Sequence, residues 1–353
     1  MDAPTHVHGR GTALNPANRF ERLHVALDPE YFDPDEPAPA TELYWDDTRS
    51  IISRHNFPDF PFEASINPYR GCEHGCIYCY ARPYHEFLGL SAGIDFETKI
   101  FVKKNAAALL RAEFMKPSWR PKPVVLSGVT DAYQPIEINL RVTRSLLEVF
   151  AEFRNPVGFI TKNALICRDL DLLAELARHN AASVTFTIGM LDEDIRRKME
   201  PRTSTIAKRF EALRKLADAG VRTSINLAPV VPGLTDQDIP GILARARDCG
   251  VGRVNCVPIR LPGAVSELFE QWLADHFPGH KEKVLKRIRQ MYGGELDDPR
   301  PLTQRMNGES ALAASIQRLF EVAWRKAGFS DQPRPPLNTE AFQRPGQTRQ
   351  LFR

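Results

Sequence analysis

Six short apolar runs alternate with amphipathic stretches between about residue 64 and residue 260. The runs are rich in β-branched residues and nearly continuous in apolar character, which is typical of strands buried on both faces of a parallel sheet. We therefore predict strands at 64–69, 123–129, 157–162, 183–190, 222–231 and 253–259.

The stretches between these runs have the period of helices that bury one face. In one of them Ile206, Phe210, Leu213 and Leu216 fall on the same side, and Gly220 provides a stop signal. The other predicted helices cover about 97–115, 142–153, 168–178 and 236–248.

Alternation of strand and helix at a spacing of about 30 residues indicates βαβ units and a parallel sheet. Six such units are too few for a closed eight-stranded barrel. The predicted fold is therefore α/β, with a partial (β/α)6 barrel of the TIM type. Its chemistry is expected at the C-terminal ends of the strands.

The flanks differ from this core in composition. Residues 1–50 are polar and rich in proline and acidic residues, and they predict an extended or partly disordered N-terminal arm. The core domain is expected over 51–262, a helical C-terminal extension over 263–329, and a polar, proline-rich tail over 330–353.

Composition places the chain among ordinary globular proteins: it has 353 residues, of which 42% are apolar and 26% charged, and a net charge of +3. The mild positive charge permits nucleic-acid contact but does not predict it. The sequence contains no run of 18 apolar residues, so it predicts no transmembrane helix. The N-terminus is polar and contains Asp2, which is unlike a signal peptide. We expect a cytoplasmic protein with no membrane partner.

Three of the six cysteines, Cys72, Cys76 and Cys79, follow the first predicted strand with the spacing C-x3-C-x2-C. Gly71 and Gly75 allow the loop to fold tightly around one centre. Clustered thiols in such a chain indicate a metal rather than disulfides. Three thiolates leave one iron of a four-iron cluster without a protein ligand, and such an open position suits a catalytic cluster.

A structural zinc site is the alternative, with His74, His55 or His85 as the fourth ligand. Structural zinc prefers paired knuckles with two-residue gaps, and the sequence has no second pair of cysteines. An alternative from another class of function is a non-catalytic iron–sulfur or zinc-binding module that serves in electron transfer or as a structural partner.

The cysteine spacing, with an aromatic residue (Tyr78) before the last cysteine, resembles the signature of the radical S-adenosylmethionine (SAM) superfamily over roughly residues 64–260. The resemblance implies a [4Fe-4S] cluster on Cys72, Cys76 and Cys79, whose open iron binds the methionine part of SAM. One electron would then cleave SAM to methionine and a 5′-deoxyadenosyl radical, which abstracts hydrogen from a substrate. It also implies a reducing partner such as ferredoxin or flavodoxin.

A second segment resembles the S-G-x-T-D-x-Y-Q-P-x-E pattern of the group around spore photoproduct lyase, often called DNA repair photolyase-like. The segment ends the second predicted strand, where the superfamily binds the methionine amino group. The alternative for its two carboxylates is a turn and a helix N-terminal charge. The residues that the resemblance implies in SAM binding are Ser127, Gly128, Thr130, Asp131, Gln134 and Glu137.

Four further matches follow in order along the chain. Lys162 resembles the lysine of the group's T-K motif, which contacts SAM, and Thr187 matches a position near the SAM ribose. Glu200 and Arg202 belong to an E-P-R motif, and residues 228–236 resemble the fifth-strand motif near the adenine. The flanks resemble an uncharacterised bacterial subfamily of the group.

The substrate is not indicated by these motifs. The group resemblance makes a lyase or repair reaction on nucleic acid the most specific hypothesis, and modification of a protein or small molecule is the alternative. Cys256 is the candidate hydrogen relay because its strand position could face the barrel interior; its alternative is a small buried apolar side chain. The basic stretch from Lys281 to Arg289 is either a nucleic-acid surface or a solvated helix face.

Overall fold

The computed structural model describes residues 7–21, 39–55, 62–297, 310–330 and 334–346. Its main sheet has seven strands in the order β10-β9-β8-β7-β6-β3-β2. All neighbours are parallel except β2, which runs antiparallel to β3. The six parallel strands confirm the predicted α/β fold with an open, partial barrel. The strands are β2 (Ser53–Arg54), β3 (Ala64–Ile66), β6 (Val124–Leu126), β7 (Val157–Thr161), β8 (Ala182–Thr187), β9 (Arg222–Val230) and β10 (Val254–Pro258).

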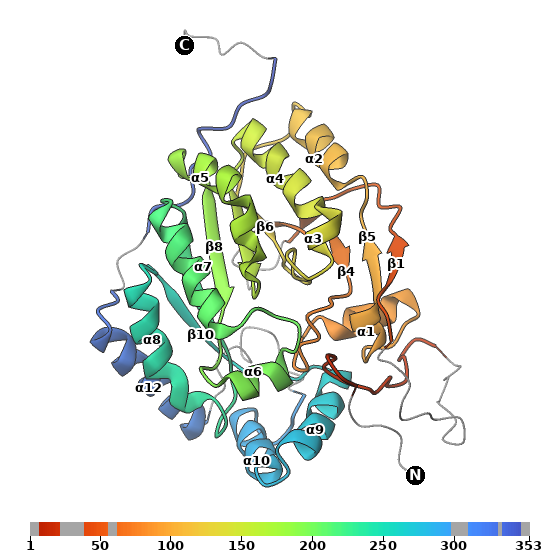
Figure 1. Ribbon diagram of the computed structural model, residues 1–353, viewed down its shortest axis with the longest axis vertical. Helices are drawn as coiled ribbons and strands as arrows, with labels where there is room; N and C mark the ends of the chain where they lie inside the picture. Colours follow the sequence, from red (N-terminus) through yellow and green to blue (C-terminus); the bar gives the residue numbers. More distant parts are fainter. Residues whose placement is uncertain (1–6, 22–38, 56–61, 298–309, 331–333, 347–353) are drawn as a thin grey trace.

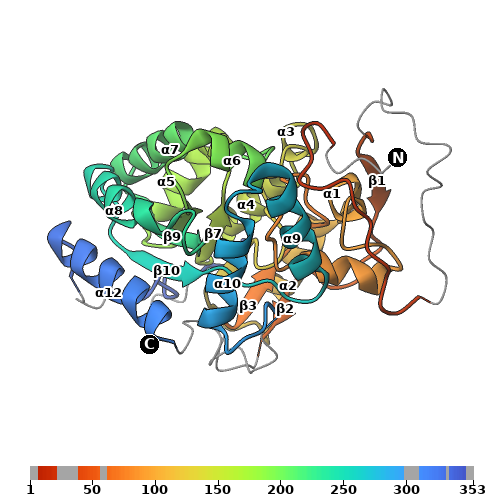
Figure 2. The same cartoon turned by 90° about the horizontal axis from the view of Figure 1, so that it is seen from below.

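Helices follow the strands and lie together along one side of the sheet (Figures 1 and 2). The longer ones are amphipathic, and each buries its apolar face against the strands. They are α4 (Val142–Phe153), α5 (Leu170–Arg178), α7 (Ile206–Asp218) and α8 (Ile239–Asp248), with the shorter α3 (Glu137–Leu140), η3 (Ala164–Asp169), α6 (Glu193–Met199) and η4 (Asp236–Asp238) between strands and helices.

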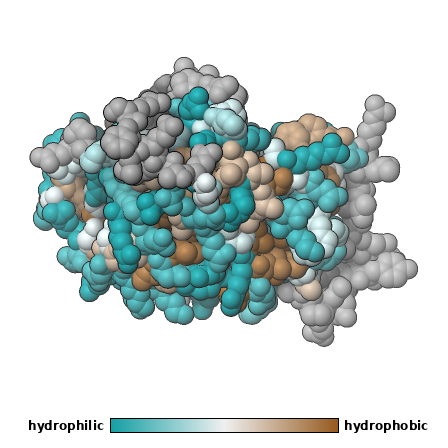
Figure 3. Space-filling model, turned by 90° about the horizontal axis from the view of Figure 1, so that it is seen from above, coloured by the Kyte–Doolittle hydropathy of each residue, from teal (hydrophilic) through white to brown (hydrophobic). Residues whose placement is uncertain are grey.

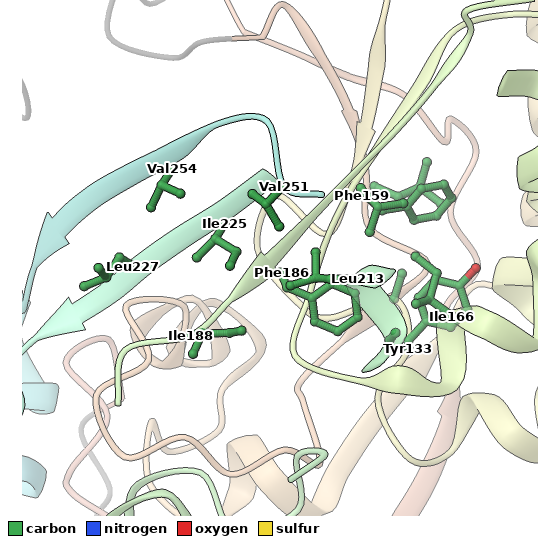
Figure 4. Packing of buried hydrophobic residues seen from close by; sticks show 14 of the residues in the cluster. Tyr133, Phe159, Ile166, Phe186, Ile188, Leu213, Ile225, Leu227, Val251 and Val254 are labelled. Carbon is green, nitrogen blue, oxygen red and sulfur yellow. The ribbon is translucent and has the colours of Figure 1, made fainter. Parts of the chain in front are cut away.

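The core lies between these helices and the sheet (Figure 4). Phe159, Phe186 and Ile225 point from three neighbouring strands toward Ile166 and Leu213 of the helical layer, and all five side chains are essentially buried. Burial of each such side chain contributes about 1.5–3 kcal/mol. The apolar positions of the strands therefore face the helices, and the opposite face of the sheet is left to other side chains.

A second, three-stranded sheet has the order β1-β5-β4 and consists of β1 (Glu42–Trp45), β5 (Lys99–Val102) and β4 (Tyr69–Arg70). The predicted helix at 97–115 is therefore wrong in its first part: a short α1 (Asp95–Thr98) precedes β5, and α2 covers Ala106–Met115. Burial alternates along Lys99–Val102, which is the period of a strand. Its partner β1 lies far away in the sequence, so no local sequence pattern predicts the pairing.

Both ends of the chain pack against this core where the structure describes them. Residues 7–21, part of the predicted arm, include the buried Arg10 and Thr12. Residues 334–346 of the predicted tail cross the helical layer, where the backbone N–H of Gln343 donates to the Phe153 carbonyl at 2.9 Å. Both segments are bound to the core: the Glu97 carboxylate accepts from the Gly11 N–H at 2.9 Å, and the Asn338 N–H donates to the Asn180 carbonyl at 2.9 Å.

The C-terminal extension is helical, with α9 (Ala264–His276), α10 (Lys281–Met291) and α12 (Ala311–Lys326). Helix α12 lies beside α8, and α9 packs near η2 (Arg82–Leu88). Figure 3 shows a surface on which hydrophilic side chains predominate. Of the helices in the described ranges, none has the length and apolar character needed to cross a membrane.

Candidate functional site

The cysteine loop (residues 71–80) lies at the C-terminal edge of the parallel sheet, after β3 and β4. Gly71 and Gly75 have φ angles of +78° and +65°, which glycine adopts without strain. A Cβ atom on Gly71 would lie 2.9 Å from the Lys99 carbonyl oxygen. The two glycines therefore permit both the turn and its close approach to β5.

All three predicted cluster ligands come from this loop. Cys72 and Cys76 are buried and Cys79 is partly exposed. The backbone N–H of Cys72 donates to the Phe96 carbonyl at 2.9 Å, and that of Cys79 donates to the Cys76 carbonyl at 3.2 Å. Burial raises the pKa of Cys76 to about 12 and raises the pKa of Cys72 well above its ordinary value. The thiols of Cys72 and Cys76 therefore stay protonated at neutral pH, and metal binding would release their protons.

A half-buried cation lies beside the cysteine loop. Lys162 directly follows β7, and its ammonium is 5.7 Å from the centre of the Tyr78 ring. Burial acts to lower the pKa of Lys162, but Cys76 and Glu200 outweigh it and the net direction is upward. A lasting positive charge stabilises nearby thiolates. Three thiols in one loop beside this charge fit an iron–sulfur cluster.

Glu200 of the predicted E-P-R motif lies in the same buried group. Its carboxylate accepts hydrogen bonds from the Tyr78 hydroxyl and, at 2.5 Å, from Arg209. Burial acts to raise the pKa of Glu200, but Arg209 and Lys162 outweigh it and the pKa is lowered. Glu200 thus links the cysteine loop to α7 as an ionised, paired group.

Asp131 lies where the ends of β6 and β7 meet. Its carboxylate accepts hydrogen bonds from the Thr161 hydroxyl (2.8 Å), the backbone N–H of Lys162 (2.8 Å) and that of Tyr133 (2.9 Å). His74 Nδ1 lies 3.3 Å from the same carboxylate. Burial acts to raise the pKa of Asp131, but His74 and the hydrogen bonds lower it. Asp131 therefore ties two strand ends to the cysteine loop, and its four partners leave little room for a further donor.

Gln134 and Thr130 hold backbone atoms of the loop and of β4. The Gln134 side chain accepts from the Glu73 N–H at 2.9 Å and donates to the Gly71 carbonyl at 3.2 Å. The Thr130 hydroxyl donates to the Tyr69 carbonyl at 2.9 Å. Both residues lie at the site, and both use their side chains to hold backbone atoms of the site in place.

Ser127 and Gly128 form the turn after β6. Ser127 has a φ angle of +76°, and its hydroxyl accepts from the Ala132 N–H at 2.8 Å. The Gly128 carbonyl accepts from the Tyr80 hydroxyl at 2.5 Å, so the turn touches the residue that follows Cys79. The turn after β6 and the cysteine loop therefore form one surface.

Glu137 is separated from this group. It is fully buried and accepts hydrogen bonds from the Tyr69 hydroxyl, the Thr143 N–H (3.0 Å) and Arg168 (2.8 Å). Arg168 also pairs with Asp169 at 2.8 Å, so Glu137 belongs to a buried ion-pair network. The placement matches the alternative of a charge near a helix N-terminus, with Glu137 at the start of α3.

Arg202 contacts the cysteine loop, and Thr187 contacts α7. Arg202 Nη1 is 3.3 Å from the Glu73 carboxylate, and its backbone N–H donates to the His74 carbonyl at 3.4 Å. Thr187 is buried at the end of β8, and its carbonyl accepts from Arg209 at 3.0 Å. The E-P-R motif therefore packs directly on the cysteine loop.

The sheet face opposite the helices carries a row of uncharged polar side chains. Thr185 and Ser224 share a hydrogen bond at 2.7 Å, and Asn255 donates to Asn226 at 3.1 Å. All four are partly exposed. Closed TIM-type barrels fill this face with bulky aliphatic residues. In this chain the same face of the sheet therefore carries hydrogen-bonding side chains instead of bulky aliphatic ones.

Cys256 lies on the other face. In the register of β10 and β9 it is opposite Leu227, and Val254 is opposite Ile225, so these side chains share the helix-facing side. Cys256 packs against the main core, and burial raises its pKa to about 12. This placement agrees with the alternative of a buried apolar side chain.

The three histidines of the zinc alternative lie apart from one another. His55 is 2.7 Å from the Ser65 hydroxyl, and His74 is bound to Asp131. The His85 ring packs on Phe96, and burial lowers its pKa to about 4. Throughout the part of the chain that is described, no group of three or more His, Cys, Asp or Glu side chains is already arranged around a metal-ion centre, and this holds for the three loop thiols as well as for the histidines.

Two residues at the loop were not predicted. Arg82 is fully buried and donates to the Cys76 carbonyl (2.9 Å) and the Gly75 carbonyl (3.2 Å). Its guanidinium forms a buried ion pair with Glu97 at 2.6 Å. An arginine in a short 3-10 helix and a glutamate in a one-turn α-helix carry no local signal of this contact.

Comparisons with known proteins agree with this geometry. Residues 66–246 match the Radical SAM superfamily. The chain is 35% identical over 239 residues to the uncharacterised protein Rv2578c of Mycobacterium tuberculosis. The aligned region covers 67% of this chain and 69% of that protein. It is 26% identical over 200 residues to the radical SAM Nalpha-GlyT isomerase of Pseudomonas phage M6, covering 56% of this chain and 39% of the isomerase.

Among solved structures, spore photoproduct lyase complexed with dinucleoside spore photoproduct has the same fold. The TM-score is 0.54 at 15% identity, and the match covers 81% of this chain and 79% of that one. With the family match over more than half of the chain, the cysteine loop at the sheet edge identifies the chain as a member of the radical SAM superfamily.

Proposed function

We propose that Cys72, Cys76 and Cys79 hold a [4Fe-4S] cluster and that the chain uses it to cleave SAM reductively. The observation that carries the proposal is the set of three thiols in one buried loop beside the charged Lys162. When bound, the cluster would supply the electron that splits SAM into methionine and a 5′-deoxyadenosyl radical, which takes hydrogen from the substrate. Membership of the superfamily supports both cofactors.

The chain's own residues would bind and orient SAM. Lys162 offers a positive charge to the methionine carboxylate, and the turn at Ser127–Thr130 offers backbone and hydroxyl oxygens to its ammonium. Thr187 is the last residue of the neighbouring strand, β8. The polar row from Thr185 to Asn255 supplies uncharged donors and acceptors for the nucleoside and for the substrate.

For the substrate we propose nucleic acid, acted on in a lyase or repair reaction. Two features support this. The structural neighbour is complexed with a dinucleoside, as its name states. Helix α10 exposes Lys283 and Lys286, and neither forms an ion pair within the described ranges. Uncompensated lysines on one helix face attract phosphates. A ferredoxin or flavodoxin in the cytoplasm would supply the electron.

Metal analysis after anaerobic reconstitution tests the proposal. We expect four iron and four sulfide per chain, together with SAM binding, and we expect Cys76→Ala to lose iron and sulfide. One zinc with no sulfide would instead establish the zinc module. An iron–sulfur cluster without SAM binding would establish the electron-transfer module. Cys167→Ala, outside the loop, serves as the control.

A further inference from the structure

The N-terminal strap (residues 9–12) lies directly against the cysteine loop, although some 60 residues separate them in sequence. The backbone N–H of Gly11 donates to Glu97 Oε2 at 2.9 Å. The Arg10 guanidinium donates to the Glu97 carbonyl at 3.0 Å. Arg10, Gly11 and Thr12 are all buried. The strap is therefore held at one residue by two independent hydrogen bonds.

Glu97 also holds the other side of the contact. Its second oxygen, Oε1, pairs with Arg82 at 2.6 Å, and both side chains are fully inaccessible to solvent. Arg82 in turn donates to the carbonyl oxygens of Gly75 and Cys76. One buried carboxylate thus connects the strap, through Arg82, to the backbone of a cluster ligand. Removal of one partner of such a buried ion pair strongly destabilises a fold, because the other charge is left buried without compensation.

The strap fits the loop closely. A Cβ atom on Gly11 would lie 1.8 Å from the Gly75 carbonyl oxygen, so no other residue is accommodated without movement. A second anchor lies farther along the same segment, where the Ile94 N–H donates to the Leu14 carbonyl at 2.9 Å. There a Cβ on Gly93 would lie 1.9 Å from that carbonyl oxygen.

We propose that the strap is a lock on the cysteine loop, with Glu97 as its positioning residue, which keeps the loop in the shape that binds the cluster and shields Cys72 and Cys76 from reagents in solvent. The inference rests on the proposed function in that the loop holds the cluster. It adds that the ligands depend on a segment outside the barrel.

Thiol labelling of the full-length, metal-free chain tests the lock. The probe is iodoacetamide, and the rate at each cysteine is read by peptide mass spectrometry. In Gly11→Ala we expect Cys72 and Cys76 to label roughly tenfold faster, since a displaced strap lowers the free energy of local opening. Buried Cys249, at the C-terminal end of α8, should keep its rate. Gly279→Ala, where a Cβ meets nothing within 4 Å, is the matched control.

A second variant, Gly93→Ala, displaces the strap at its other anchor and should give the same pattern. Unchanged rates at Cys72 and Cys76 in both variants would overturn the lock. Equal acceleration at Cys249 would also overturn it, because general destabilisation would then account for the effect. The assay needs neither cluster nor SAM. Absence of iron and sulfide would therefore remove the proposed function without altering this result.

The reconstituted protein gives a further readout. Loss of the visible iron–sulfur absorbance in the presence of a chelator should be several-fold faster in Gly11→Ala than in Gly279→Ala, because an unlocked loop opens more often. Identical rates in the two variants would contradict the lock.

Discussion

The ammonium of Lys162 lies 5.7 Å from the centre of the Tyr78 ring, so the end of β7 meets the cysteine loop through a cation and an aromatic face. Cys76, Cys79, Glu200 and Asp131 all act to raise the pKa of this lysine against the effect of burial. At neutral pH, where the Cys76 thiol is itself protonated, the carboxylates of Glu200 and Asp131 maintain this positive charge beside the cysteine loop.

Replacement of Lys162 by alanine should weaken SAM binding about tenfold or more, because a charge-assisted contact is lost. The cluster should remain, since the cysteine loop keeps its other bonds. Equilibrium dialysis of SAM against the reconstituted protein measures the effect. Lys208→Ala, at an exposed position in α7, is the control. Equal SAM affinity in both variants would remove Lys162 from the site.

Glu200→Ala should destabilise the metal-free chain by about 3–5 kcal/mol, because it leaves Arg209 buried and unpaired. Arg197→Ala, which removes an ion pair with Asp194 whose side chains are 70% and 48% exposed, should cost less than about 1 kcal/mol. Urea unfolding compares the two. A mild effect of Glu200→Ala, combined with loss of SAM binding, would instead make Glu200 a cofactor ligand.

His85 should make the chain acid-sensitive. Burial lowers its pKa from 6.5 to about 4, so between these values the unfolded chain binds a proton that the folded chain does not. Stability is then fully present above pH 6.5 and falls as the pH drops toward 4, by about 2 kcal/mol between pH 7 and pH 5. Urea midpoints at the two pH values measure this. His85→Phe, which cannot titrate, should lose less, and an equal loss would contradict the assignment.

Cys256→Ala should leave SAM cleavage unchanged, because the strand register places the thiol on the helix-facing side. We expect slow alkylation as well, since its pKa is about 12. Formation of 5′-deoxyadenosine by wild type and variant provides the comparison. Loss of that product with an intact cluster would return Cys256 to the reaction centre.

Charge reversal on α10 tests the nucleic-acid proposal. Lys283→Glu combined with Lys286→Glu should abolish salt-dependent binding of single-stranded or damaged DNA, because the phosphate contacts would become repulsive. Fluorescence anisotropy over a range of salt concentrations measures the affinity. Reversal of Lys208 is the control. Wild-type protein that binds neither DNA nor RNA at low salt would end the proposal.

The six parallel strands and the cysteine loop are predictable from the sequence, because the strands depend on local periodicity and the loop on close spacing of cysteines. Phe186 and Ile225, for example, lie in runs whose apolar character already indicates burial. The β1–β5 pairing and the bond from Gly11 to Glu97 could not be predicted, because the partners lie far apart and neither has a periodic pattern.

The predicted site residues divide in the same way. Asp131, Gln134 and Lys162, which the motif order selects, all lie at the cysteine loop, but the motifs do not indicate what each side chain contacts there. Asp131 and Gln134 are largely occupied by backbone partners, and Glu137 lies in a separate ion-pair network. Such roles follow from packing between strand ends, which a sequence pattern does not encode.

Formation of 5′-deoxyadenosine is the most direct test of the central claim. The anaerobically reconstituted protein is mixed with dithionite and SAM, and the product is quantified by chromatography for wild type and Cys76→Ala. The account predicts 5′-deoxyadenosine from wild type and none from the variant. Intact SAM in the wild-type reaction, in protein that carries its iron and sulfide, or equal product from both proteins, would contradict it.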